Sequence, residues 1–271
     1  MSEPLILHCE DSLEGIFTAI YDAFVYKKQL QTPYTDSIEI VFGENANYSL
    51  FAREIEITTD LNKVQKTVTT IQNRLGYMVY SSLLSALCHY DENRATVVLG
   101  YLVRAFAKGE SLTGHLSDPY VLRVMELTRK VGNEKEKFCG FLRFRVVPLG
   151  EDLPGLREYF SSGEEKREVL FARVEPKCNL IPLLLDHFTD RYPGEHFIIY
   201  DPKRKLAVVH EAYHRSVLVS GEELSLSGQG KDEFEELWKQ YFRTMEIQQR
   251  HNPKCQRNLM PLWYRKNLVE I

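Results

Sequence analysis

The sequence lacks several features that would assign the protein to a well-known class. No apolar run approaches the ~20 residues that a membrane-spanning helix needs. The first eleven residues lack the cationic segment that opens a secretory signal peptide. The five cysteines are widely scattered and form no CxxC pair, so a disulfide framework is not expected. These absences predict a cytoplasmic protein that has no membrane partner.

Motifs for common cofactors and nucleophiles are missing as well. The chain contains no G-x-x-x-x-G-K-[ST], no G-x-G-x-x-G after a strand, and no G-x-S-x-G. These absences argue against ATP-driven, dinucleotide-dependent and α/β-hydrolase chemistry, and we expect no cofactor. The formal net charge of -4 over 271 residues excludes a protein that is basic throughout, although a local basic patch remains compatible with it.

The first half of the chain is predicted to be mainly helical after a short strand. Apolar residues at 5–9 form the strand, and Asp11 and Glu14 have the spacing of a capping box for the helix that follows. Within residues 35–57, apolar and polar side chains alternate in the way that is typical of extended chain. Apolar residues then recur every three or four positions over 61–131, with Asp60 as the expected helix cap.

The second half is predicted to contain mainly antiparallel strands. We expect strands at 138–147 and 169–174, then a helix capped by Asn179 and ending near Tyr192, then a hairpin over 197–209. Closing helices are expected at 232–249 and 262–269. The fold class is therefore α+β. Its domains are a βα and helical lobe over 1–135 and an antiparallel-sheet lobe with a basic tail over 136–271.

The pentapeptide at 210–214, HEAYH, matches the zinc motif H-E-x-x-H. On a helix its two histidines would lie one turn apart and share a zinc ion, with Glu211 as general base. Residues 206–209 instead indicate the second strand of a hairpin. His210 and His214 are then expected at a strand end, and we assign no metal site. A zinc hydrolase remains the alternative.

Charge is strongly segregated near the C-terminus. Residues 239–271 contain seven basic and two acidic residues, whereas residues 222–236 contain six acidic and one basic. Lysine and arginine bind phosphates, and the interspersed His251, Trp263 and Tyr264 are able to stack on exposed bases. The tail is therefore a candidate phosphate-binding surface. Alternatively, the basic side chains of the tail form a solvated surface and its aromatic residues belong to the core. A third alternative is that the tail docks an acidic protein.

A third set of polar residues surrounds the second-half sheet. Arg143 and Arg145 alternate with apolar residues, and His187 and Arg191 lie one turn apart on the predicted helix. Asp201 and Arg204 occupy the hairpin turn. Such a cluster is able to bind phosphate and orient a base, or to form a structural ion-pair network.

Four segments resemble one uncharacterised bacterial family, described as probable DNA metabolism proteins. They are residues 140–144 (GFLRF), 186–192 (DHFTDRY), 199–204 (IYDPKR) and 250–261 (RHNPKCQRNLMP). The resemblance implies a role in DNA repair or modification beside a radical S-adenosylmethionine (radical SAM) protein. Some members are fused to a uracil-DNA glycosylase-like domain. The chain has no CxxxCxxC, so the partner's iron–sulfur cluster would not be bound here.

These observations lead to one main hypothesis, a DNA-binding accessory protein of DNA metabolism that acts with a radical SAM partner and possesses no metal of its own. The candidate nucleic-acid-binding residues are Arg143, Arg191, Arg204, Arg250, Asn252 and Arg257. If the protein is catalytic, His187 and Asp201 are the candidates for proton transfer. A zinc-dependent hydrolase and a non-catalytic protein-interaction subunit are the alternatives.

Overall fold

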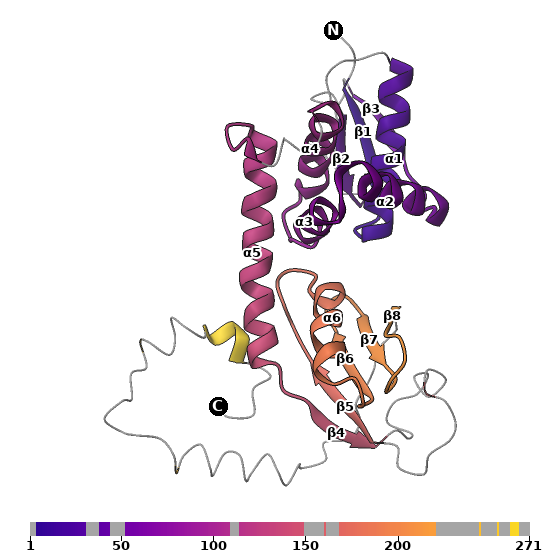
Figure 1. Cartoon of the computed structure of the whole chain (residues 1–271). Helices are drawn as coiled ribbons and strands as arrows, with labels where there is room; N and C mark the ends of the chain where they lie inside the picture. Colours follow the sequence, from indigo (N-terminus) through magenta and orange to yellow (C-terminus); the bar gives the residue numbers. More distant parts are fainter. Residues whose placement is uncertain are drawn as a thin grey trace. The chain divides into compact units, whose positions relative to one another are not determined.

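The computed structural model describes residues 4–30, 38–43, 52–108, 114–148, 160, 168–220, 244, 254 and 261–265 (Figure 1). The chain divides into two compact units, Met1–Gly132 and Asn133–Ile271. The fold class is α+β, as predicted. None of the helices in the described ranges is long and apolar enough to cross a bilayer.

The first unit contains a three-stranded parallel sheet. Its strands are β1 (Leu5–Cys9), β2 (Ile38–Phe42) and β3 (Arg53–Glu56), in the order β2-β1-β3. Leu5 pairs with Ile38 on one side and with Arg53 on the other. All five residues of β1 are buried, as the nearly continuous apolar sequence of a central parallel strand requires.

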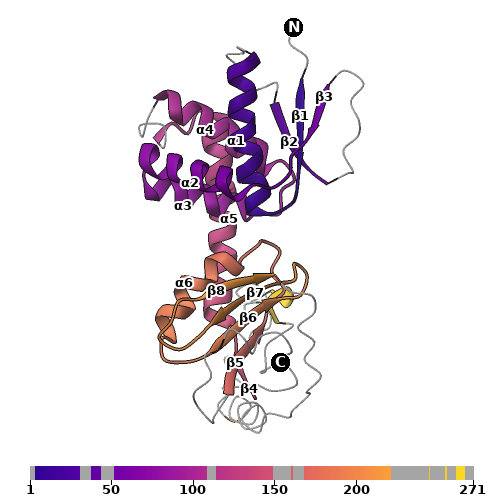
Figure 2. The same ribbon diagram turned by 90° about the vertical axis from the view of Figure 1, so that its right-hand side faces the viewer.

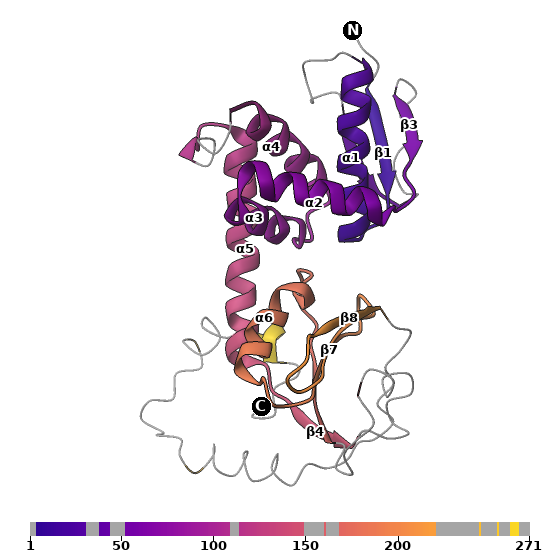
Figure 3. The same ribbon diagram turned by 45° about the vertical axis from the view of Figure 1, so that its right-hand side comes forward.

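Helices pack on this sheet and on one another (Figure 3). They are α1 (Leu13–Leu30), α2 (Leu61–Leu75), α3 (Tyr77–Leu87), α4 (Arg94–Lys108) and α5 (Pro119–Phe141). Leu5, Leu7 and Cys9 of β1 belong to the same buried cluster as Ile16 and Ile20 of α1. Helical apolar spacing over 61–131 therefore predicted these helices correctly.

The two predicted caps in this unit have different outcomes. The Asp60 carboxylate accepts from the Asn62 amide and caps α2, which confirms that prediction. The Asp11 cap is wrong, because the Ser12 hydroxyl accepts from the Gly15 amide at the start of α1. The Asp11 carboxylate instead pairs with the buried Arg94 guanidinium. The role of Asp11 is therefore determined by a partner 83 residues away, which local sequence spacing does not reveal.

The predicted strand at 138–147 is wrong in its first part, because α5 continues to Phe141 and β4 (Arg145–Pro148) begins only at Arg145. The buried residues Leu127, Val131, Glu134 and Phe138 follow one another at helical spacing. This buried face extends the helix past the point at which the sequence becomes rich in aromatic residues.

The second unit contains a five-stranded mixed sheet. Its other strands are β5 (Glu168–Arg173), β6 (Phe197–Asp201), β7 (Leu206–His210) and β8 (Val217–Ser220), in the order β4-β5-β6-β7-β8. All pairs are antiparallel except β5 with β6, which α6 (Ile181–Arg191) connects. The predicted β-β-α-β-β order is confirmed, and β8 extends it.

Both faces of the central strand, β6, are buried. In Figure 2, α6 lies on one face, where Phe197 packs against Phe144, and Phe144 packs against Phe188 of α6. Phe171 and Ile198 belong to a cluster on the other face. Asn179 does not cap α6, because Leu180 is the N-cap residue and no side chain caps the helix. The predicted helix at 232–249 lies outside the described residues, and of 262–269 the structure describes only a 3₁₀ helix, η5 (Leu262–Arg265).

Gly100 of α4 provides a stability test of the first unit. A Cβ atom at Gly100 would lie within 3 Å of the Tyr120 ring, which the Arg104 guanidinium covers at 4.1 Å from its centroid. Gly132 of α5 has no atom within 4 Å of the corresponding position. We expect Gly100→Ala to destabilise the protein by about 1–3 kcal/mol in urea unfolding. The matched control, Gly132→Ala, gains helix propensity and should stabilise by up to about 1 kcal/mol. Equal effects of the two substitutions would contradict the close packing of Tyr120.

Candidate nucleic-acid interface

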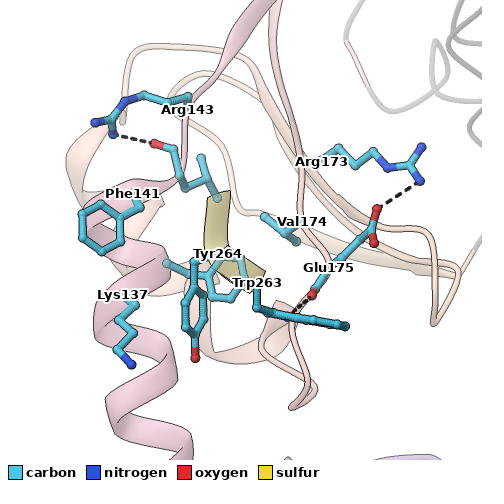
Figure 4. Close-up of a pocket in the computed structure, with 10 residues that line it drawn as sticks. Lys137, Phe141, Arg143, Arg173, Val174, Glu175, Trp263 and Tyr264 are labelled. Carbon is cyan, nitrogen blue, oxygen red and sulfur yellow. Dashed lines mark hydrogen bonds and ion pairs between the residues drawn. The ribbon is translucent and has the colours of Figure 1, made fainter. Parts of the chain in front are cut away.

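A small pocket lies in the second unit between the end of α5, the end of β5 and η5 (Figure 4). Its lining is aromatic and apolar at the base and cationic at the edge. The lining residues are Lys137, Phe138, Phe141, Leu142, Arg143, Arg173, Val174, Glu175, Trp263 and Tyr264. Three of these side chains are cationic and one is acidic, so the lining has an excess of positive charge although the whole chain carries a charge of -4.

Trp263 is the most accessible aromatic residue of the pocket. Its indole N–H donates to the Glu175 carbonyl at 3.0 Å, and the residue remains 40 % exposed. The Glu175 carboxylate accepts from Arg173 at 3.3 Å. An indole has only one donor, so this hydrogen bond orients the ring while leaving apolar surface in contact with solvent.

Cations lie next to both aromatic residues of η5. The Lys177 ammonium is 5.6 Å from the Trp263 ring centroid, and the Lys137 ammonium is 4.8 Å from the Tyr264 ring centroid. Tyr264 also packs edge-on against Phe138 of α5. Tyr264 is therefore mainly a packing residue, whereas Trp263 combines an exposed ring with a neighbouring positive charge.

The main chain beside Trp263 is held by a buried carboxylate. Glu134 of α5 is only 5 % exposed, and its two oxygens accept from the Lys177 and Cys178 amides, each at 2.9 Å. A buried carboxylate is tolerated when hydrogen bonds replace its hydration, as they do here. Glu134 thereby fixes the chain that follows β5 to α5, close to the carbonyl that accepts from Trp263.

Arg204 binds the same stretch of main chain from the β6–β7 turn. Its guanidinium donates to the Pro176 carbonyl at 3.1 Å, to the Lys177 carbonyl, and to the Asp201 carboxylate at 2.7 Å. Asp201 is fully buried and also accepts from the Lys203 and Arg204 amides. Asp201 and Arg204 thus form the ion pair that the sequence analysis considered, and the pair anchors 176–177.

His187 and Arg191 lie on α6, as predicted, one turn apart. The His187 ring packs edge-on against Phe188, and its buried Nε2 has no hydrogen-bond partner among the described residues. Arg191 is exposed and donates to the Tyr192 hydroxyl. The described hydrogen bonds of Asp201 do not include His187, so their shared role in proton transfer stays a prediction.

The HEAYH segment has the strand-end conformation expected for it. His210 is the last residue of β7, and residues 212–214 form a turn in which Tyr213 has a φ of 63°. The His210 ring stacks on Phe197, its Nδ1 lies 2.9 Å from the Ser216 hydroxyl, and its Nε2 lies 3.5 Å from the Pro193 carbonyl. Burial lowers the pKa of His210, the hydrogen bond to the Pro193 carbonyl opposes this effect, and the neighbouring His196 and His214 add to it. His210 is thus a buried residue whose surroundings disfavour its protonated form.

The described ranges contain no group of three histidine, cysteine or carboxylate side chains placed to hold a metal ion. Cys9, Cys88 and Cys178 are buried, and Cys139 is half-buried. Burial, together with the neighbouring Asp11, raises the pKa of Cys9 to about 12, so this thiol is protonated at neutral pH.

Some of the residues singled out from the sequence line the pocket. Arg143 lines the pocket, and Trp263 was already expected to face a nucleic acid. Arg250, Asn252 and Arg257 lie outside the described residues. Sequence reasoning missed Lys137 and Arg173, which lie at the ends of α5 and β5. Following the helical spacing past residue 131 would have placed Lys137 on α5 beside Phe138 and Phe141.

A family model matches residues 92–270, which include every residue that lines the pocket. Its description is a domain of unknown function, DUF4130. This chain belongs to the DUF4130 family. The matched residues begin just before α4, so they leave out the parallel sheet of the first unit. No curated protein matches the chain.

The Glu134 carboxylate is open to a direct test of its role. In Glu134→Gln the amide NH₂ would face one of the two backbone N–H donors that the carboxylate now binds. We expect a loss of about 2 kcal/mol in unfolding free energy and a change in tryptophan emission, because Trp263 is hydrogen-bonded to the adjoining chain. The control Glu136→Gln, at an exposed position of the same helix, should stay within about 0.5 kcal/mol of the parent. Equal stability of both variants would contradict the assigned role.

The lowered pKa of His210 leads us to expect that the stability of the protein depends on pH. The pKa of His210 is lowered in the folded protein, so the unfolded chain binds the extra proton first as the pH falls below about 6.5. Stability that is complete above this pH is therefore lost as acid is added. In His210→Asn, which retains a polar group toward Ser216, the urea midpoint should fall less between about pH 7.5 and pH 5.5. His115→Asn, at an exposed position of the first unit, is the control. A pH profile unchanged by His210→Asn would refute the assignment.

Proposed function

We propose that the protein is a nucleic-acid-binding component of DNA metabolism, acting in DNA repair or modification with a radical SAM partner. The observation that carries the proposal is the pocket of the second unit, where the exposed Trp263 ring lies among Lys137, Arg143, Arg173 and Lys177. Aromatic rings beside basic side chains are the usual components of a surface that binds the backbone and bases of nucleic acid.

The basic tail supports the same proposal. Trp263 and Tyr264 belong to the segment 239–271, which has a large excess of basic residues. Arg250, Asn252 and Arg257 are proposed to extend the cationic surface along this tail. Arg191, on α6, is a further proposed phosphate contact. Arg204 is proposed to contribute mainly by anchoring the chain next to Lys177, because its guanidinium already donates to two carbonyls and to Asp201.

The two alternatives have less support. A zinc hydrolase would need His210 and His214 on one metal, whereas His210 is buried and His214 is exposed in a turn. A non-catalytic subunit that docks an acidic protein would also use cationic side chains. It would have no need of the exposed Trp263 ring.

DNA binding is tested by its salt dependence. Each phosphate contact that is lost lowers the slope of log K against log salt by about 0.7–0.9. The double substitution Lys137→Gln/Arg143→Gln should therefore reduce the slope by about 1.5 and weaken binding to all DNA sequences. The same reduction is expected for Arg250→Gln/Arg257→Gln. The control Arg129→Gln/Lys130→Gln removes the same charge from exposed positions of α5 in the first unit and should leave the slope unchanged.

Two results would count against the proposal. DNA binding that does not depend on salt, or an absence of binding up to high micromolar protein, would refute it. A partner protein that remains bound after nuclease treatment, while purified DNA does not bind, would favour the protein-docking alternative.

A further inference from the structure

We propose that the pocket binds an unpaired base, stacked on Trp263, so that the ligand is single-stranded DNA and not an intact duplex. This inference rests on the proposed function and specifies its substrate class. It begins from the way in which Trp263 is held. The hydrogen bond to the Glu175 carbonyl uses the only donor of the indole, so Trp263 would contact a base through the exposed part of its ring and not through its N–H.

The surroundings of the ring match the chemistry of a nucleotide. Lys177 lies 5.6 Å from the ring centroid, and Lys137, Arg143 and Arg173 lie around the edge of the pocket (Figure 4). The one acidic side chain of the lining, Glu175, is paired with Arg173. A flat aromatic ligand with anionic groups beside it, such as a base joined to phosphates, satisfies both the ring and the cations.

The pocket is small, and this determines the kind of recognition that it allows. A base would lie over the exposed part of the indole and would be held by stacking, with the cationic side chains of the lining close enough to contact its phosphates. Stacking of this kind tolerates any base, because every base has a π-face. We therefore expect weak sequence preference.

An intact duplex does not offer what the pocket binds. In a duplex both faces of each base are covered by neighbouring base pairs, and only the edges are accessible in the grooves. A base must leave the stack before it reaches an aromatic ring, and this costs least in a single strand or at a damaged base. The cations alone would still attract a duplex, so weaker, purely electrostatic duplex binding is expected.

The chain contains two tryptophans, Trp238 and Trp263, which permits a direct spectroscopic test. In the full-length Trp238→Phe protein all tryptophan emission comes from Trp263. The probes are a thymine-only oligonucleotide, a duplex of the same length, inorganic polyphosphate and thymidine monophosphate. The oligonucleotide should quench the emission. Polyphosphate, which has the charge but no base, should bind without the same quenching.

Affinity measurements on variants complete the test. Trp263→Ala should weaken oligonucleotide binding by about 5- to 150-fold while leaving polyphosphate and duplex binding within about twofold. Trp263→Phe retains a ring and should recover part of the loss, which separates stacking from a general loss of structure. Tyr213→Ala, which removes an exposed aromatic ring elsewhere in the second unit, is the matched control and should bind like the parent.

The outcomes separate this inference from the proposed function. Salt-dependent DNA binding that is unaffected by Trp263→Ala would overturn the unpaired-base inference and leave the proposed function standing. Binding of the monophosphate as tight as that of the oligonucleotide would also overturn it, in favour of a free-nucleotide site. If no DNA binds at all, both fail.

Discussion

The main chain at 175–178 is the constraint on which the second unit depends most. This stretch leaves the buried strand β5 and precedes α6, and its polar groups need partners inside the protein. Glu134 binds the amides of Lys177 and Cys178, Arg204 binds the carbonyls of Pro176 and Lys177, and Trp263 binds the carbonyl of Glu175. Side chains from three distant parts of the sequence thus meet on four residues of backbone.

Asp201 completes this arrangement by neutralising Arg204. Without Asp201, a guanidinium that binds backbone carbonyls would lack an anionic partner next to a buried strand. Without Arg204, a fully buried carboxylate would retain only two amide donors. The pair therefore has a sufficient structural reason to exist. This structural role does not test the catalytic role predicted for Asp201, but it shows that the carboxylate already has strong partners.

Local patterns predicted the elements whose residues interact along the chain. The Asp60 cap, the helical spacing over 61–131 and the 197–209 hairpin depend on neighbours a few residues away, and all are confirmed. Two of the failures concern residues with distant partners. Asp11 was predicted to cap α1 but pairs with Arg94, and the length of α5 depends on the burial of Glu134 and Phe138 against other elements.

The pocket could not be predicted from the sequence for the same reason. Lys137, Arg173 and Trp263 are separated by tens of residues, and only the folded chain brings them around Glu175. The type of ligand that we propose follows from the aromatic and basic composition of the tail, because composition needs no tertiary information. The proposed place of binding could be named only from the three-dimensional contacts.

The anchoring side chains and the ligand-facing side chains of the interface are different residues. Glu134 and Arg204 hold the backbone but do not line the pocket, whereas Lys137, Arg143 and Arg173 line it. Trp263 alone belongs to both groups, through its N–H on one side and its exposed ring on the other. Changes at the edge of the pocket are therefore expected to alter affinity for the proposed ligand with little effect on the fold. Changes at Trp263 affect both, which is why phenylalanine, and not only alanine, is needed there to distinguish them.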